Sequence, residues 1–486
     1  MSLSSHRGDL ESESSKSIRS VGIDIGSTTT QIVFSKLKLG YIEGTNKLDV
    51  VNREITYLSD VFMTPFKGSY SIVVKRLSSI LNRIYEDAGF ALGEVDTGAI
   101  IITGEAARRR NSRKIIDLFA NQMGKFVCAI AGPNYEAALA AHGSGSLKLS
   151  YRQKISVMNV DIGGGTSKIA VLRNGQVVDT ASLYVGARCI VLDEKGRLTR
   201  FNNPGEIIAR ATDVSLRLGE KMPETDQRRM ACAMANCLFE VMRRCQISDL
   251  TKQLMITPQL NYKGTINRIV FSGGVAEYIY GYEDRDFGDL GRILGGEIRI
   301  GIRDLEACLS EPKERIRATV IGVSQYTLQV SGTTNFVSDL SLLPLRNLPI
   351  VAPSFAVRGV PKESVEKAIK RSLEMHDISE GEDYVALMFS RSVIDQPSYE
   401  TMKTLAGAII STLENTIKNR KTIVIVFEAD IGRGMGRVIK EEISPKINLV
   451  SIDEIVLHGF NYVDIGKPTG ERGLIPVVIK SLVFPT

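Results

Sequence analysis

Two short segments, far apart in the chain, combine a carboxylate with a run of small residues in the same way. DIGSTTTQIVF begins at Asp24 and DIGGGTSKIAV begins at Asp161, and the two agree at five of eleven positions. In each, β-branched residues precede the aspartate and apolar alternation resumes after the small residues, which is typical of a β-hairpin with a tight turn. The small residues are Gly26, Ser27, Thr28 and Thr29 in the first turn and Gly163, Gly164, Gly165 and Thr166 in the second.

Glycine and hydroxyl residues in a tight turn suit the binding of a polyanion. Glycines let backbone N–H groups approach phosphate oxygens closely, and the hydroxyls of Ser and Thr add donors. A carboxylate at a strand end is a hard ligand for hydrated Mg²⁺, which takes one or two carboxylates together with phosphate oxygens. A plain hairpin would explain one copy, but it explains poorly why both copies carry the aspartate. We therefore expect the two turns to hold one triphosphate from both sides, with Asp24 and Asp161 in the Mg²⁺ shell.

Two single residues near these turns have more than one interpretation. Glu105 follows an apolar strand in IITGEA, and it would either order a water molecule for attack or interact with the positive end of a helix dipole. Lys168 follows the second turn, and strand alternation would direct it either to a phosphate or to solvent.

Other segments supply the elements that would position the two turns. INRIVFSGGVAEYIY (266–280) indicates a strand, a turn of small residues and a helix. GPNYEAALAAHG (132–143) and RATVIGVSQYTLQ (317–329) indicate helices rich in small residues, and SIVVKRLSSILNRIYEDAGF indicates an amphipathic helix. Residues 204–256 also predict helices, with one apolar stripe that we interpret as core.

The last third of the chain predicts a separate α/β unit. The composition shifts in a Leu- and Pro-rich stretch at 341–354, which is typical of a linker. The expected elements that follow are a helix at 362–375, a strand at 383–390, a helix at 398–418 and a strand at 422–428. EADIGRGMGRV (428–438) lacks the spacing and the second βαβ half of a dinucleotide loop, so we expect a flexible turn near a partner surface there.

Bulk composition narrows the class of protein. A chain of 486 residues predicts about two to four domains. There is neither an apolar run of about 18 residues nor the layout of a signal peptide, so we expect a cytoplasmic protein with no membrane partner. A net charge of +6 is mild for this length, so no nucleic-acid partner is predicted. Six scattered cysteines without a CxxC pair indicate reduced thiols.

The order of these segments resembles the actin-like ATPase superfamily, which includes actin, chaperone ATPases and sugar kinases. The resemblance implies an α/β fold with duplicated ribonuclease-H-like subdomains around a nucleotide cleft, plus a C-terminal α/β domain. The implied division is a disordered tail (1–19), a first lobe (20–150), a second lobe (151–336) and a family-specific domain (337–486). It also implies catalytic roles for Asp24, Asp161 and Glu105, and an adenosine site bordered by Ser272, Gly273, Gly274 and Val275.

A narrower resemblance covers nearly the whole chain after residue 20. SVGIDIGSTTTQIVFS, GAIIITGEAARRRNSR, IRATVIGVSQYTLQVSG, LPLRNLPI and YVDIGKPTGERGLIPVVIKSLVFP together resemble the ethanolamine ammonia-lyase reactivating factors of ethanolamine-utilisation operons. This resemblance implies a chaperone that uses ATP/ADP and Mg²⁺ to exchange damaged cobalamin in ethanolamine ammonia-lyase for intact adenosylcobalamin. It suggests association with a bacterial microcompartment and leaves a homodimer open. A small-molecule kinase and a filament-forming protein of the same superfamily are the alternatives.

One departure from the superfamily pattern concerns hydrolysis. Chaperone ATPases carry a glutamate at the start of the first connecting helix, where it helps to activate the attacking water. The matching position here is Asn134, whose amide cannot take a proton, and Glu136, two residues on, is expected to face elsewhere. We therefore expect slow ATP hydrolysis and a switch driven mainly by nucleotide binding.

Overall fold

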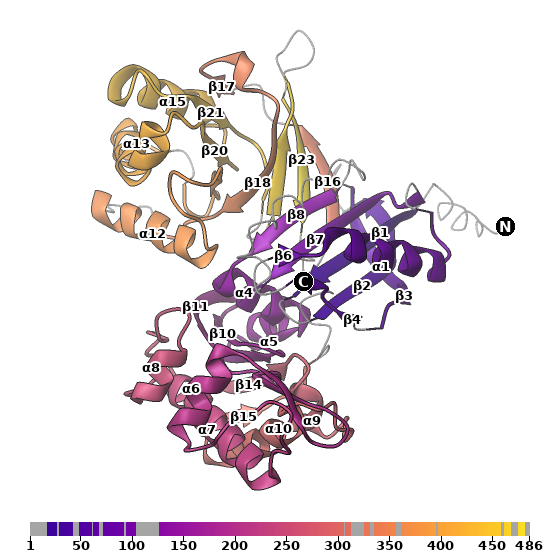
Figure 1. Cartoon of the computed structure of the whole chain (residues 1–486). Helices are drawn as coiled ribbons and strands as arrows, with labels where there is room; N and C mark the ends of the chain where they lie inside the picture. Colours follow the sequence, from indigo (N-terminus) through magenta and orange to yellow (C-terminus); the bar gives the residue numbers. More distant parts are fainter. Residues whose placement is uncertain are drawn as a thin grey trace, which may run out of the picture.

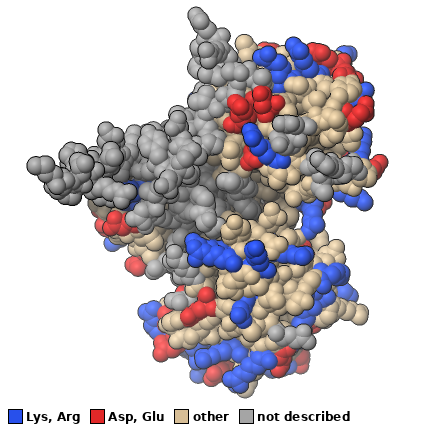
Figure 2. Space-filling model, turned by 180° about the vertical axis from the view of Figure 1, so that it is seen from behind, with Lys and Arg blue, Asp and Glu red and all other residues tan. Residues whose placement is uncertain are grey.

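The computed structural model describes most of the chain. The described residues are 17–26, 29–41, 48–60, 62–67, 71–91, 94–103, 126–305, 307–312, 325–330, 335–355, 361–394, 397–457, 461–467 and 475–481. Figure 1 shows three bodies: a first lobe in indigo and violet, a second lobe in magenta and a C-terminal domain in orange and yellow. Seen from behind, the second lobe carries Lys and Arg interspersed with Asp and Glu on its surface (Figure 2).

The first lobe is built on a mixed sheet with strand order β3-β2-β1-β7-β8. The β3–β2 and β2–β1 pairs are antiparallel, and β7 and β8 run parallel to β1. The strands are β1 (Ser17–Ile25), β2 (Thr29–Tyr41), β3 (Leu48–Leu58), β4 (Phe62–Met63), β5 (Phe66–Lys67), β6 (Ser71–Ile72), β7 (Thr97–Thr103) and β8 (Phe126–Ala131). The last three residues of the predicted N-terminal tail therefore belong to β1, while residues 1–16 lie outside the described residues.

The predicted amphipathic helix of this lobe is confirmed as α1 (Val74–Asp87). Its Leu77, Leu81 and Ile84 recur at intervals of three and four residues, so they lie on one face of the helix. That face packs in one cluster with Ile23 of β1 and covers the sheet.

The second lobe repeats the design of the first. Its sheet has the order β11-β10-β9-β14-β15, with an antiparallel trio followed by two strands parallel to β9. The strands are β9 (Ser156–Ile162), β10 (Ser167–Arg173), β11 (Gln176–Leu183), β12 (Ile190–Leu192), β13 (Leu198–Phe201), β14 (Arg268–Ser272) and β15 (Cys308–Leu309). Because β1 and β9 occupy the same place in equivalent sheets, the predicted actin-like ATPase fold is confirmed.

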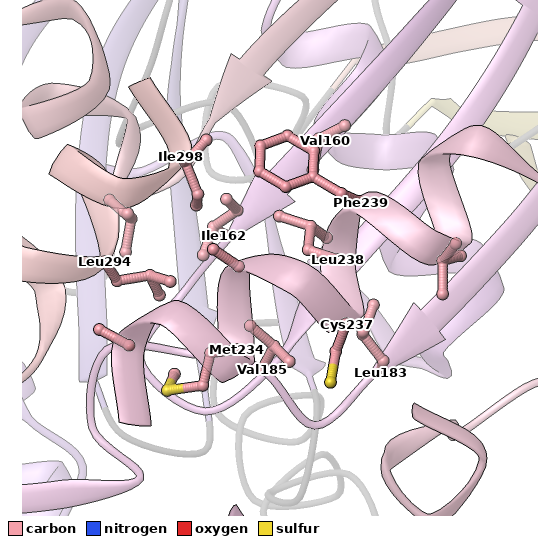
Figure 3. Packing of buried hydrophobic residues seen from close by; sticks show 14 of the residues in the cluster. Val160, Ile162, Leu183, Val185, Met234, Cys237, Leu238, Phe239, Leu294 and Ile298 are labelled. Carbon is pink, nitrogen blue, oxygen red and sulfur yellow. The ribbon is translucent and has the colours of Figure 1, made fainter. Parts of the chain in front are cut away.

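Helices link and cover these sheets. They are α4 (Pro133–Gly143), α5 (Ser146–Gln153), α6 (Asn203–Ala211), α7 (Glu224–Arg243), α8 (Asp249–Leu254), α9 (Ala276–Tyr280) and α10 (Gly291–Gly301). The stripe predicted to be core is confirmed, because Met234 and Leu238 of α7 pack against Ile162 of β9 and Leu294 of α10 (Figure 3). Within the described ranges, no helix is both long enough and apolar enough to cross a membrane.

The C-terminal domain contains four parallel strands, β18 to β21, extended by antiparallel strands. Its strands are β16 (Gln325–Val330), β17 (Phe336–Val337), β18 (Leu345–Val351), β19 (Ala386–Phe389), β20 (Ile423–Phe427), β21 (Leu449–Ile452), β22 (Asn461–Ile465) and β23 (Pro476–Ser481). Its helices are α12 (Lys362–Met375), α13 (Tyr399–Thr412), α14 (Glu414–Lys418) and α15 (Gly432–Arg437). The helix predicted at 362–375 is confirmed, and the one predicted at 398–418 is interrupted at Leu413.

Three predictions for this part of the chain are wrong. The second small-residue helix was expected at 317–329, but residues 325–329 form part of β16, which pairs with β23. The stretch at 341–354 was expected to be a linker, but it contains β18, an interior strand of the sheet. The turn at 428–438 was expected to be flexible, but Gly432 and Gly436 are buried, and a Cβ on Gly436 would lie 2.4 Å from the side chain of Phe336. These glycines permit close packing.

Candidate functional site

The two aspartates occupy equivalent positions in the two lobes. Asp24 stands opposite Gln31 in the β1–β2 hairpin, and Asp161 stands opposite Lys168 in the β9–β10 hairpin. Burial by itself lowers the pKa of Lys168, but the negative charges of Glu136, Asp161 and Asp24 outweigh this effect and raise its pKa. One ammonium is therefore held in its charged form by carboxylates from both lobes.

Lys168 forms an ion pair with Glu136 of α4. The two side chains are only 8% and 6% exposed, so the interpretation that Lys168 points to solvent is wrong. The expectation that Glu136 faces away from the site is wrong. Successive helix residues are about 100° apart, so Glu136 and Asn134 point to nearly opposite sides of α4. Asn134 is the one that faces elsewhere, because its amide oxygen accepts a hydrogen bond from Thr180 of β11 at 2.9 Å.

A chain of buried hydrogen bonds orients the Asp161 carboxylate. The Ser272 hydroxyl donates to Asp161 Oδ1 at 2.8 Å, and Asn159 Nδ2 donates to Ser272 Oγ at 3.3 Å. Asn159 Oδ1 in turn accepts from the hydroxyls of Ser144 and Ser146, beyond the end of α4, at 2.8 and 2.9 Å. Ser272, predicted to border adenosine, therefore uses its side chain to hold Asp161, and nothing in the sequence pattern indicated the role of Asn159.

The segment that follows β11 supports the second glycine turn through a backbone hydrogen bond and close packing. Gly163 N donates to Thr166 O at 3.0 Å, which closes the turn. The carbonyl of Gly164 accepts from the backbone N–H of Arg188 at 2.6 Å. A Cβ on Gly186 would lie 2.6 Å from Gly165 C and from Thr166 N, so the supporting segment can approach this closely only with glycine at that position.

The first turn is described only in part. The carbonyl of Gly26 accepts a hydrogen bond from the Thr64 hydroxyl at 2.8 Å. Ser27, Thr28, the side chain of Thr29 and Glu105 lie outside the described residues, so their roles stay predictions.

The predicted adenosine turn is confirmed as a strand, turn and helix, formed by β14 and α9. Gly273 has φ +84°, and a Cβ on it would lie 2.4 Å from the carbonyl oxygen of Ile162, directly after Asp161. The turn therefore packs against the end of β9. Val275 is only 2% exposed and packs in the core, so its backbone is the part that could border a ligand.

The described residues contain no group of three His, Cys, Asp or Glu side chains that could hold a metal ion on its own. Asp24 and Asp161 offer two carboxylates from opposite lobes. That donor set fits Mg²⁺, which completes its shell with water and phosphate oxygens rather than with a protein cage.

A family profile described as "Ethanolamine utilisation protein EutA" matches residues 16–485. The protein from Salmonella typhimurium named ethanolamine ammonia-lyase reactivase EutA is 33% identical over 477 residues, which are 97% of this chain and 99% of that protein. The Escherichia coli protein of the same name is 32% identical over 482 residues, with the same coverage. The crystal structure of the Aquifex aeolicus member of the Ppx/GppA family covers 63% of this chain and 97% of its own, at 14% identity and a TM-score of 0.38.

Proposed function

The chain belongs to the family of ethanolamine utilisation protein EutA, and from this premise we propose that it reactivates ethanolamine ammonia-lyase with a nucleotide bound between its two lobes. The observation that carries the proposal is the match along almost the entire length to relatives named as reactivases of that lyase. In this proposal the client is ethanolamine ammonia-lyase, and the protein assists the exchange of its damaged cobalamin for adenosylcobalamin.

The paired hairpins support the nucleotide part of the proposal. The backbone N–H groups of the two turns hold the phosphates, one turn from each lobe. Asp24 and Asp161 hold the hydrated Mg²⁺, which neutralises charge on the phosphate oxygens. Without the metal, a polyphosphate would meet the negative charges of both aspartates and of Glu136, which Lys168 balances only in part. ATP and ADP therefore bind as Mg²⁺ complexes.

Hydrolysis of the bound ATP is slow in this proposal. Glu136 of α4 is a carboxylate beside the second hairpin, but it is committed to a buried ion pair with Lys168. A carboxylate that is stabilised in its charged form by a cation is a weak base. Asn134 does not account for the slow hydrolysis, because it lies on the other side of α4.

Lobe movement connects nucleotide binding to the lyase. A ligand that contacts both lobes favours the arrangement in which the two turns are closest, and it shifts the population toward that arrangement. The two arrangements differ in their affinity for the lyase. Binding of the lyase by the favoured arrangement weakens the lyase's hold on the damaged cobalamin. The protein acts in the compartment of its client, the cytoplasm or a bacterial microcompartment.

The proposal is tested with ethanolamine ammonia-lyase inactivated by bound cyanocobalamin. This protein, adenosylcobalamin and Mg²⁺ are added with ATP, with ADP or with no nucleotide, and acetaldehyde production is followed. We expect activity to return only with ATP, and Asp161→Ala to abolish the recovery. Recovery without nucleotide would contradict the nucleotide part of the proposal, and no recovery under any condition would contradict the reactivase role itself.

A further inference from the structure

Arg188 lies beside the second glycine turn and reaches toward the first lobe. Its backbone N–H donates to Gly164 O, so its Cα is fixed against the turn. Its guanidinium Nη1 lies 3.2 Å from the Met63 sulfur in β4. Met63 is paired with Thr29 across β2 and β4, where the first turn ends. One side chain therefore extends from the second turn to the strand that pairs with Thr29 in the first lobe.

The guanidinium is oriented by a buried carboxylate. Arg188 Nε donates to Asp289 Oδ2 at 3.1 Å, and Asp289 Oδ1 accepts from Gly291 N at 2.8 Å at the start of α10. Asp289 is 8% exposed, whereas the Arg188 side chain is 25% exposed and can be reached from solvent. Because guanidinium is planar, fixing Nε sets the direction in which the two terminal nitrogens donate.

The chemistry of the neighbours favours an anionic ligand for those terminal nitrogens. A thioether is a weak acceptor, so the contact with Met63 is readily replaced by a phosphate oxygen. Lys168, a second cation among the described residues of the site, is already paired with Glu136 and feels the negative charges of two aspartates. Guanidinium binds phosphate through two parallel hydrogen bonds, which an ammonium cannot form.

We propose that Arg188 binds the terminal phosphate of the nucleotide and makes the site prefer ATP over ADP. This inference rests on the proposed nucleotide site. It adds a phosphate ligand outside both hairpins. A terminal phosphate held by Arg188 and by the first turn links the two lobes, so loss of that phosphate removes the link.

The test compares Arg188→Met and Arg188→Lys with the unmodified chain, by calorimetric titration with Mg²⁺–ATP and Mg²⁺–ADP. A charge-assisted pair of hydrogen bonds predicts that Arg188→Met weakens ATP binding by about 10- to 100-fold. ADP binding should change less than about threefold. Arg188→Lys keeps the charge beside Asp289 and should give an intermediate loss for ATP. The matched control is Arg210→Met, which removes a surface arginine of α6 that is 77% exposed and should change neither affinity.

Each outcome decides the inference. Equal losses for ATP and ADP in a folded Arg188→Lys variant, or no loss in either variant, would overturn it while leaving the nucleotide site intact. If the unmodified chain binds neither nucleotide, the proposed nucleotide site fails and this inference fails with it. A melting curve of each variant separates loss of binding from loss of folding.

Discussion

Neutralising Glu136 and neutralising Lys168 should change ATP affinity in opposite directions. Three carboxylates (Asp24, Asp161 and Glu136) and one ammonium (Lys168) leave two net negative charges where the phosphates are expected. The nearby ion pair of Arg188 and Asp289 adds no net charge. Glu136→Gln reduces this to one and releases the ammonium from its partner. Lys168→Met raises it to three. Both substitutions preserve side-chain volume approximately, so the main difference between them is the sign of the charge removed.

The magnitude follows from simple electrostatics. At an effective dielectric of about 20, two unit charges roughly 7 Å apart interact by about 2 kcal/mol, or about 30-fold in affinity. Salt and the bound metal reduce this effect. We therefore expect Glu136→Gln to tighten ATP binding about tenfold at low Mg²⁺ and Lys168→Met to weaken it by a similar factor, with both effects shrinking as Mg²⁺ is raised.

The assay is calorimetric titration of ATP at several Mg²⁺ concentrations. Glu206→Gln is the matched control, because it removes one negative charge at a surface side chain of α6 that is 52% exposed and paired with Arg210. Melting curves are needed beside the titrations, because each substitution leaves the other member of a buried ion pair without its partner. If the two folded variants change ATP affinity in the same direction, the electrostatic account of the site is wrong.

The remaining predictions concern one metal ligand and one titrating group. Asp161→Ala should weaken Mg²⁺–nucleotide affinity at least about tenfold, and an unchanged affinity by calorimetry would refute the arrangement of two turns around one nucleotide. Burial raises the pKa of Asp377 to about 6, against the hydrogen bonds that it accepts from Tyr135 and Asn134. Between about pH 4 and pH 6, the Asp377 carboxyl is therefore protonated in the folded chain and ionised in the unfolded chain. This contribution to the free energy of unfolding, up to about 3 kcal/mol, falls as the pH rises through that range. Asp377→Asn should flatten the pH dependence of the melting temperature between about pH 4 and pH 6. If the melting temperatures of the variant and the unmodified chain differ by the same amount at every pH, Asp377 is not the titrating group.

Local patterns in the sequence predicted a large part of the site. The two hairpins and the turn at Gly273 are visible because strand alternation and small residues lie within a few positions of each other. The interactions that connect these pieces were not predictable in this way. Glu136 was misplaced because the face of α4 that meets β10 depends on how the helix packs, not on the helix itself. Residues 325–329 were misassigned because they were read together with the small-residue stretch before them. Their own Tyr326 and Thr327 favour a strand, and pairing with β23 decides it.

The position of α4 explains why its two polar residues have different partners. On one side, Glu136 pairs with Lys168 at the second hairpin. On the other, the Asp377 carboxylate, from the end of α12, accepts from Tyr135 N at 2.8 Å and from Asn134 Nδ2 at 3.1 Å. Asp377 thereby caps a helix whose own N-cap residue, Gly132, has no side chain to do so. A movement of α4 relative to the second hairpin must therefore either break its contacts with α12 or carry the C-terminal domain with it.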